Sequence, residues 1–182
     1  MSVEPKDIVK FLTENVEPVT DIYSEKAYRA AAVLKDGTYL PCVMFRKTSD
    51  VVGLAMRRFD ETRGKKLHPS VNYESIVKTF MAGRNVIAPF HVDKVEKSPF
   101  ALPAEFYRQI CASGETSMSW HQFTAKMRDG KIFSFGSSCD LEFFELQQGS
   151  TMDDIVEVSP HKKTGGDYLK PKIFFDCLLD EL

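Results

Sequence analysis

The segment Thr116–Phe135, TSMSWHQFTAKMRDGKIFSF, determines the predicted fold of this chain. Apolar and aromatic residues recur on both sides of Asp129-Gly130. An Asp-Gly pair between two such runs indicates a tight hairpin turn, because the turn needs a positive φ angle and glycine adopts it without steric cost. We therefore predict two antiparallel strands joined at Asp129-Gly130.

A second segment, Lys26–Phe45 (KAYRAAAVLKDGTYLPCVMF), has the same layout around Asp36-Gly37. Here we expect one strand from about Tyr28 to the turn and a second strand after it. Pro41 has no N–H group for a ladder hydrogen bond, so the second strand is expected to lie at a sheet edge near this residue. The two hairpins together define the predicted fold.

Apolar residues at helical spacing predict four helices. Proline near the first position supports the first and the last of them, because its missing N–H is not needed there. The four predicted helices span Pro5–Val16, Ser49 or Asp50 to Phe59, Asn72–Ala82 and Pro103–Cys111. For the C-terminal segment a helix over Ile173–Leu182 and a strand over Lys172–Cys177 both stay open.

Further extended segments are predicted at Asn85–Lys97, Leu141–Leu146 and Ile155–Val158, from short apolar runs between turn residues. With the hairpins they give roughly six to eight strands, and with about four or five helices packed on a mostly antiparallel sheet the fold class is α+β. We expect a single domain over residues 1–182. The alternative is two lobes, about 1–84 and 85–182, related by duplication, because a helix precedes each hairpin.

The composition is that of an ordinary globular protein. Of the 182 residues, 43% are hydrophobic and 12% are aromatic, which is enough to build a core and argues against disorder. The formal net charge of −2 disfavours a globally basic nucleic-acid-binding protein. No apolar run approaches the roughly 20 residues of a membrane span, and Met1–Asp7 lacks the features of a secretory signal. We therefore expect a cytoplasmic protein without membrane association.

The four cysteines favour the same compartment. They lie far apart in the sequence, mostly among apolar neighbours, and no Cys-x-x-Cys motif occurs. Buried, reduced thiols are typical of cytosolic proteins, and this is the state expected for these side chains. The residues concerned are Cys42, Cys111, Cys139 and Cys177.

Trp120-His121, in the first quoted segment, is one candidate site. On an alternating strand the two side chains face opposite ways. Trp120 is a candidate binding residue and His121 a candidate acid–base residue; the alternative interpretation is that Trp120 anchors the core and His121 is a half-exposed strand residue. However, no serine, cysteine or carboxylate lies at motif spacing from this histidine. Because the histidines are scattered along the chain, we expect no metal site and no cofactor. They are His68, His91, His121 and His161.

A basic segment after the second predicted helix is the other candidate site. It contains Arg57, Arg58, Arg63, Lys65 and Lys66. Arginine side chains bind phosphates and carboxylates through paired N–H donors, so the segment could hold an anion or an acidic partner. It lacks the upstream glycine and the downstream hydroxyl residue of a phosphate-binding loop. A solvated helix end, where cations complement the helix dipole, is the alternative interpretation.

These patterns favour a non-catalytic protein-binding module: an adaptor, an immunity-type inhibitor or an oligomer subunit. Its partner would be another protein or a second copy of the chain, contacted through the basic segment or through exposed strand edges. A small hydrolase is the first alternative, with a cleft made of His91, His121 and a distant Asp or Cys. The second is binding of phosphate or nucleic acid through Arg57–Lys66, although nucleic acid is not the expected partner.

Overall fold

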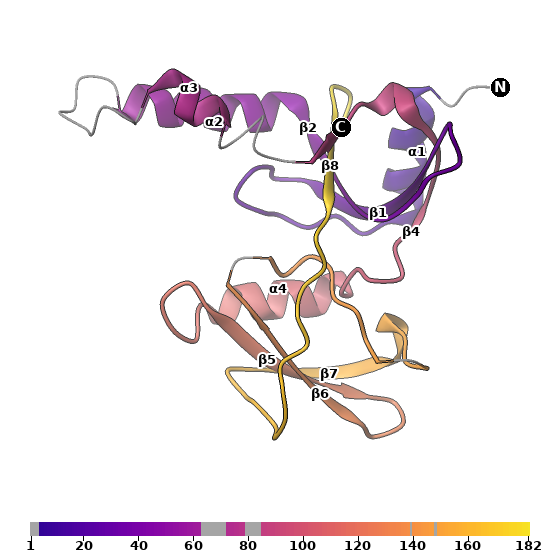
Figure 1. Ribbon diagram of the computed structural model, residues 1–182, viewed down its shortest axis with the longest axis vertical. Coiled ribbons are helices and arrows are strands. Elements are labelled where there is room, and N and C mark those ends of the chain that lie inside the picture. The colour runs from indigo at the N-terminus through magenta and orange to yellow at the C-terminus, as the bar shows by residue number, and fades with distance from the viewer. Residues whose placement is uncertain (1–3, 63–71, 79–84, 139, 148) are drawn as a thin grey trace. The chain divides into compact units, whose positions relative to one another are not determined.

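The computed structural model describes residues 4–62, 72–78, 85–138, 140–147 and 149–182. It confirms the α+β class: the described residues contain four α-helices, a five-stranded sheet and a three-stranded sheet, mostly antiparallel (Figure 1). The backbone forms two compact units, which we call unit 1 (Met1–Lys97 with Phe174–Leu182) and unit 2 (Ser98–Ile173). That residues 1–182 form one domain, or two lobes related by duplication, stays a prediction.

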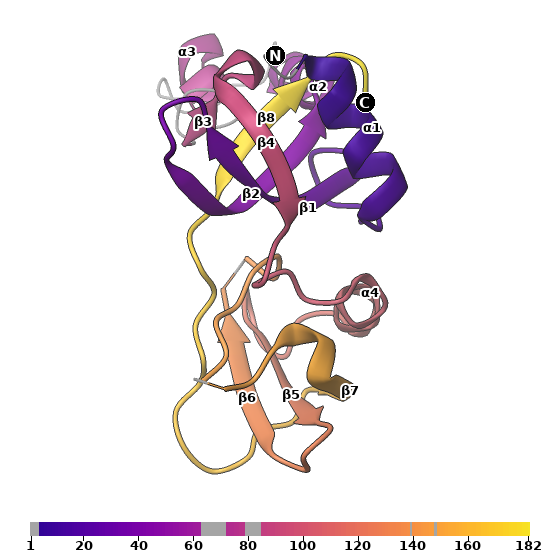
Figure 2. The same cartoon turned by 90° about the vertical axis from the view of Figure 1, so that its right-hand side faces the viewer.

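Unit 1 contains the five-stranded sheet. Its strands are β1 (Ala27–Leu34), β2 (Tyr39–Lys47), β3 (Val86–Ile87), β4 (Val92–Lys97) and β8 (Phe175–Leu179). They lie in the order β3-β8-β2-β1-β4 (Figure 2). The predicted hairpin is confirmed, because β1 and β2 pair antiparallel and Gly37 has a φ angle of 86° in the turn. β4 also pairs antiparallel with β1, whereas β8 is parallel to both β2 and β3.

Pro41 lies at an irregular point of this sheet. The register of β1 and β2 shifts between Ala30, which pairs with Val43, and Ala32, which pairs with Leu40. β8 pairs with β2 only from Val43 onward. The sequence prediction of a local edge at Pro41 therefore agrees with the pairing, and proline is tolerated here because no ladder hydrogen bond from its nitrogen is required.

The helices of unit 1 are α1 (Pro5–Asn15), α2 (Thr48–Thr62) and α3 (Tyr73–Val77). α1 has proline at its start and a capping box in which Glu4 and Asp7 each accept the other's backbone N–H. Its buried residues Ile8 and Leu12 pack with the apolar face of the sheet to form the core. The last part of the predicted Asn72–Ala82 helix, residues 79–82, lies outside the described residues.

Unit 2 contains the second predicted hairpin. β5 (His121–Met127) and β6 (Ile132–Ser137) pair antiparallel, Gly130 has a φ angle of 87° in the turn, and β7 (Ile155–Pro160) pairs antiparallel with the other edge of β5. The predicted helix before it is confirmed as α4 (Ala104–Ser113). Aromatic rings fill the core: Phe123 stacks on Phe135 at 4.8 Å between centroids, and Phe144 meets both rings edge-on. Short 3₁₀ turns occur at Pro89–His91 in unit 1 and Met152–Asp154 in unit 2.

The C-terminal segment, for which a helix and a strand both stayed open, is a strand, β8. One other prediction was wrong in detail. The predicted strand over Leu141–Leu146 is not regular: Phe143 and Phe144 make single bridges to different partners, Ala101 and Pro171. Both side chains are fully buried, whereas a strand would place consecutive side chains on opposite faces.

Two local predictions also need correction. The hairpin strand begins at His121 and not at Thr116, because the preceding residues form a tight loop in which Ser119 has a φ angle of 55°. Cys111 was expected among the buried thiols but is exposed on α4, while Cys42 and Cys177 are buried as predicted. Cys139 lies outside the described residues.

Candidate functional site

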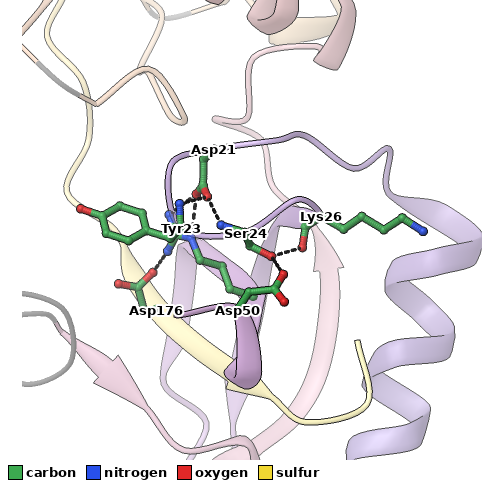
Figure 3. Close-up of polar contacts among 7 residues, drawn as sticks. Asp21, Tyr23, Ser24, Lys26, Asp50 and Asp176 are labelled. Atoms are coloured by element: carbon green, nitrogen blue, oxygen red, sulfur yellow. Dashed lines mark hydrogen bonds and ion pairs between the residues drawn. The ribbon is translucent and has the colours of Figure 1, made fainter. Parts of the chain in front are cut away.

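A buried arginine organises one end of the unit 1 sheet. Arg46, on β2, has a side chain only 1% exposed. It donates from Nε to Oδ2 of Asp21 at 2.7 Å and pairs with the same oxygen through Nη2 at 2.6 Å, while Nη1 pairs with Asp176 of β8. The guanidinium also lies over the ring of Tyr23, 5.1 Å from its centroid. Figure 3 shows this group of polar contacts, with Asp21 and Asp176 contributed by distant parts of the chain.

Asp21 connects this buried charge to a surface turn. Its second oxygen, Oδ1, accepts the backbone N–H groups of Tyr23 and Ser24, each at 2.8 Å. The Asp21 N–H in turn donates to the carbonyl of Ser24 at 3.1 Å. One carboxylate oxygen therefore binds the buried Arg46 and the other binds the backbone of the turn. Aspartate side chains typically accept hydrogen bonds from the backbone N–H groups two or three residues further on in such turns. This arrangement fixes the backbone on both sides of Ile22.

Ser24 attaches the turn to the start of α2. Its hydroxyl lies 2.7 Å from Oδ2 of Asp50, in the first helical turn, and 2.9 Å from the carbonyl oxygen of Lys26 (Figure 3). A hydroxyl has one proton to donate, so these two acceptors compete for it. Ser24 is itself buried, and its hydroxyl links the turn to Asp50 and to the backbone of Lys26, so the group positions the turn.

A hollow of about 430 Å³ lies between the turn and α2. The turn contributes residues 21–25, and α2 contributes side chains from its first two and a half turns. Ile22 stands at the tip of the turn and is 75% exposed. We call this face the Ile22 surface, and it comprises Ile22, Glu25, Asp50, Gly53 and Arg57.

The basic segment predicted from the sequence is only partly described. Arg57 lines the hollow of the Ile22 surface. Its neighbour Arg58 instead pairs with Glu61 one turn further along α2, at 3.1 Å between Nη1 and Oε2. The other three predicted residues, Arg63, Lys65 and Lys66, lie outside the described residues, so the phosphate or nucleic-acid function of this segment stays a prediction.

Trp120 packs within unit 2. Its half-buried ring lies against the backbone of Gly136 so closely that a Cβ atom there would stand 2.3 Å from Cζ2 of the indole. The ring also meets Tyr168 edge-on, with 5.8 Å between centroids, and the Tyr168 hydroxyl donates to Oε1 of Gln122 at 2.5 Å. These contacts hold the segment around Tyr168 against the β5–β6 hairpin, which is a structural role for Trp120.

The two candidate catalytic histidines belong to different units. His91 is in unit 1, is exposed and lies against the ring of Phe90, with 4.2 Å between centroids. His121 is in unit 2, where its Nδ1 is buried and has no hydrogen-bond partner among the described residues. Hydrogen bonds from Thr38 and, more weakly, the charge of His91 lower the pKa of the Asp36 carboxyl. In the described part of the chain no group of three potential metal ligands occurs. The hydrolase alternative therefore gains no support from these contacts and stays a prediction.

Sequence reasoning identified Arg57 but missed the residues that build the site around it. A weak signal existed for Arg46, which is a charged residue at the end of the apolar run of β2. Its partners could not be found in the same way, because Asp21 lies 25 positions away and Asp176 lies 130 positions away. Ile22 gave no pattern at all, since one apolar residue in a turn is common.

No protein-family model, no curated protein and no solved structure matches this chain. No helix in the described part of the chain is long and apolar enough to cross a membrane. The Ile22 surface itself offers one exposed apolar side chain, two carboxylates and one guanidinium. These groups are suited to contacting another molecule by apolar burial and ion pairing.

Proposed function

We propose that this chain is a non-catalytic protein-binding module and that the Ile22 surface is its contact site. The observation that supports this most is Ile22 itself, an apolar side chain left 75% exposed at the tip of a turn held by several hydrogen bonds. Burying an isoleucine side chain in a partner contributes about 1.5–3 kcal/mol. The surrounding polar residues would form the rim that such a central anchor requires.

The rigidity of the turn strengthens this proposal. Binding is weakened when a loop must be ordered on contact, at about 0.5–1.5 kcal/mol for each immobilised side chain. Here the backbone of the turn is already fixed by Asp21, and Asp21 is held by the buried Arg46. Ser24 holds the other side of the turn on Asp50. A partner would therefore meet Ile22 in its bound position.

Two of the sheet edges, those of β6 and β4, are less suitable contact sites than the sequence had suggested. The edge of β6 is covered, because Leu169 donates its N–H to the carbonyl of Ser134 at 2.8 Å and accepts the N–H of Gly136 at 3.3 Å. The edge strand β4 carries four charged residues in six, Asp93, Lys94, Glu96 and Lys97. Charged edge strands disfavour pairing with another chain, so we propose contact through side chains of the Ile22 surface instead.

We place this function in the cytoplasm. The support is the state of the thiols: Cys42 and Cys177 are buried and unlinked in unit 1. Reduced thiols persist in the cytosol, where disulfides are rare. Reversible labelling of cysteines in intact cells would test this, and a disulfide at either residue would contradict it.

Partner capture with two matched isoleucine variants tests the contact site. The tagged chain is used to capture proteins from its source cells, and the affinity of the main captured protein is then measured with purified components. We expect Ile22→Ser to weaken binding about 10- to 100-fold, the equivalent of one buried isoleucine side chain. Ile173→Ser is the control, because Ile173 is 83% exposed but lies in unit 2.

The two adjacent arginines give a second comparison. Arg57→Ala should weaken the same complex, whereas Arg58→Ala should not, because only Arg57 lines the hollow. Melting temperatures of all four variants should stay near that of the wild type, because each altered side chain is exposed. Equal capture by the wild type and by Ile22→Ser would exclude the Ile22 surface as the contact site.

A further inference from the structure

We infer that the occupant of the Ile22 surface is a second copy of this chain, related to the first by a two-fold axis that passes near Gly53. This inference rests on the proposed function, since it names the partner of the same surface. A two-fold interface uses one patch on both copies, so the patch must be complementary to itself. The described residues of the Ile22 surface meet that requirement in three ways: opposite charges lie at its two ends, the apolar side chain of Ile22 is exposed on it, and Gly53 leaves room for a second helix to cross α2.

The charges are separated in the way a two-fold axis needs. Asp50 lies in the first turn of α2, next to the turn that carries Glu25, so the negative charges gather at one end of the hollow. Arg57 follows Asp50 by seven residues, which places it about 10 Å further along the helix. Rotation by 180° about a point between them brings each Arg57 onto the acidic end of the other copy. The same ion pair then forms twice.

Arg57 is available for such a pair. No carboxylate in the described parts of the chain lies within ion-pair distance of it, whereas the adjacent Arg58 is already paired with Glu61. The neighbouring stretches in the sequence add no carboxylate, because residues 63–71 and 79–84 contain neither aspartate nor glutamate. The charge of Arg57 is therefore left for a partner, and the acidic end of a second copy supplies the opposite sign.

Gly53 lies between the two charged ends, where two copies of α2 would cross. It is exposed, and a Cβ atom built on it would meet nothing within 4 Å. A glycine at a crossing point lets two helices approach closely. Val52 and Met56 flank it at 40% and 42% exposed, and with Ile22 they provide apolar area to bury. This apolar area is the part of the interface that would provide most of the association energy.

Sedimentation velocity on the full chain, from about 1 μM to about 1 mM, tests the inference. We expect the mass to rise with concentration from 20.7 kDa toward twice that value. Arg57→Glu and Glu25→Arg should each weaken the dimer about 10- to 100-fold, because two symmetry-related pairs become repulsive. An equimolar mixture of the two variants should dimerise like the wild type, since both pairs are then attractive again.

Gly53→Arg tests the interface with a substitution that should leave the fold of the single chain intact. Its Cβ would meet nothing within 4 Å in the isolated chain, so we expect the melting temperature not to fall, while the long side chain would block the crossing of two helices. A dimer that survives Gly53→Arg, or charge variants that fail to recover on mixing, would place the interface elsewhere and overturn the inference.

The failure of this inference can be told apart from the failure of the proposed function. A wild-type chain that stays at 20.7 kDa at every concentration overturns the second copy as partner. If that monomer still loses its captured protein on Ile22→Ser, the proposed function stands with a different partner. If the monomer captures the same proteins with and without Ile22, both proposals fall.

Discussion

Arg46 and Asp176 form a buried ion pair although 130 positions separate them in the sequence. All of unit 2 lies between them in the chain. Arg46 is on β2 and Asp176 is on β8, and these strands run parallel. The pair therefore joins β8 to the β1–β2 hairpin of unit 1. Because Arg46 also binds Asp21, the same guanidinium positions the turn that presents Ile22.

Replacing Arg46 should destabilise the chain strongly. Arg46→Met would leave the carboxylates of Asp21 and Asp176 buried without their cation, which costs about 3–5 kcal/mol in comparable cases. Arg58→Met is the control, since the Arg58–Glu61 pair has exposed side chains and such pairs contribute about 0–1 kcal/mol. The measurement is the free energy of unfolding in urea for both variants.

The charge explanation can be separated from lost packing. Adding Asp21→Asn and Asp176→Asn to Arg46→Met removes the two negative charges that face Arg46, and the amide oxygen introduced at position 21 would still accept the backbone N–H groups that Asp21 binds. The triple variant should therefore be more stable than Arg46→Met alone. The guanidinium carbon lies 5.1 Å from the ring centroid of Tyr23 and 5.9 Å from that of Phe174. A triple variant less stable than the single one would show that the guanidinium acts mainly through packing against these two rings.

Gly136→Ala tests the packing of Trp120. The new Cβ would stand 2.3 Å from Cζ2 of Trp120 and 3.1 Å from a ring carbon of Tyr168, so the rings must move. Overpacking of this kind costs about 1–3 kcal/mol. Gly165→Ala is the control in the same unit, because its Cβ would meet nothing within 4 Å. Thermal unfolding measures both, and equal stability of the two variants would contradict the close contact.

The same packing predicts a rescue. Trp120→Leu removes the ring that a side chain at position 136 would strike, so the combined cost of Trp120→Leu and Gly136→Ala should be smaller than the sum of the separate costs. Strict additivity would show that the strain lies in the backbone of β6 and not in the indole.

The cysteines should differ sharply in reactivity. Burial raises the pKa of the Cys177 thiol from 9.0 to about 12, so the reactive thiolate is scarce in the folded chain. Cys111 is exposed and should be labelled by iodoacetamide at pH 8.5 before Cys42 and Cys177, which are buried. Peptide mapping by mass spectrometry after short pulses measures each residue separately. Rapid labelling of Cys177 without urea would contradict its burial.

The raised pKa of Cys177 also has a consequence for stability. The folded chain keeps this proton between pH 9 and about 12, while the unfolded chain releases it. The contribution of the Cys177 thiol to the free energy of unfolding is therefore complete below about pH 9 and is lost as the pH rises toward 12. In the Cys177→Ala variant the free energy of unfolding should fall less between pH 9 and about 12 than in the wild type. An equal fall in both proteins would show that other titrating groups cause it.

The sequence predicted the two hairpins well because their signal is local. Asp36-Gly37 and Asp129-Gly130 each place a glycine where the φ angle is 86° or 87°, and few other residues adopt such angles without strain. Helix α1 was equally accessible, since its proline, its acidic first turn and its apolar stripe lie within one short segment. In these places the neighbouring residues alone decide the conformation.

Long-range pairing explains where the sequence failed. The residues of β8 fit either a helix or a strand by pattern, and their conformation is decided by pairing with β2 far away in the chain. The same limit applied to the candidate site. Arg57 was identifiable as a charged residue in a basic segment, whereas the role of Ile22 depends on a turn that Arg46 holds from another strand. No local sequence pattern contains both Ile22 and Arg46.

Two glycines of unit 1 should respond to alanine in opposite directions. A Cβ would meet nothing within 4 Å at either Gly37 or Gly53, so only the backbone differs between them. Gly53 lies inside α2, where alanine is more favourable than glycine by about 0.5–1 kcal/mol, so Gly53→Ala should raise the melting temperature. Gly37 has a φ angle of 86°, and alanine there should lower stability by about 1–2 kcal/mol. Thermal unfolding at low chain concentration compares the two without self-association, and a stabilising Gly37→Ala would be inconsistent with the tight turn that begins β2.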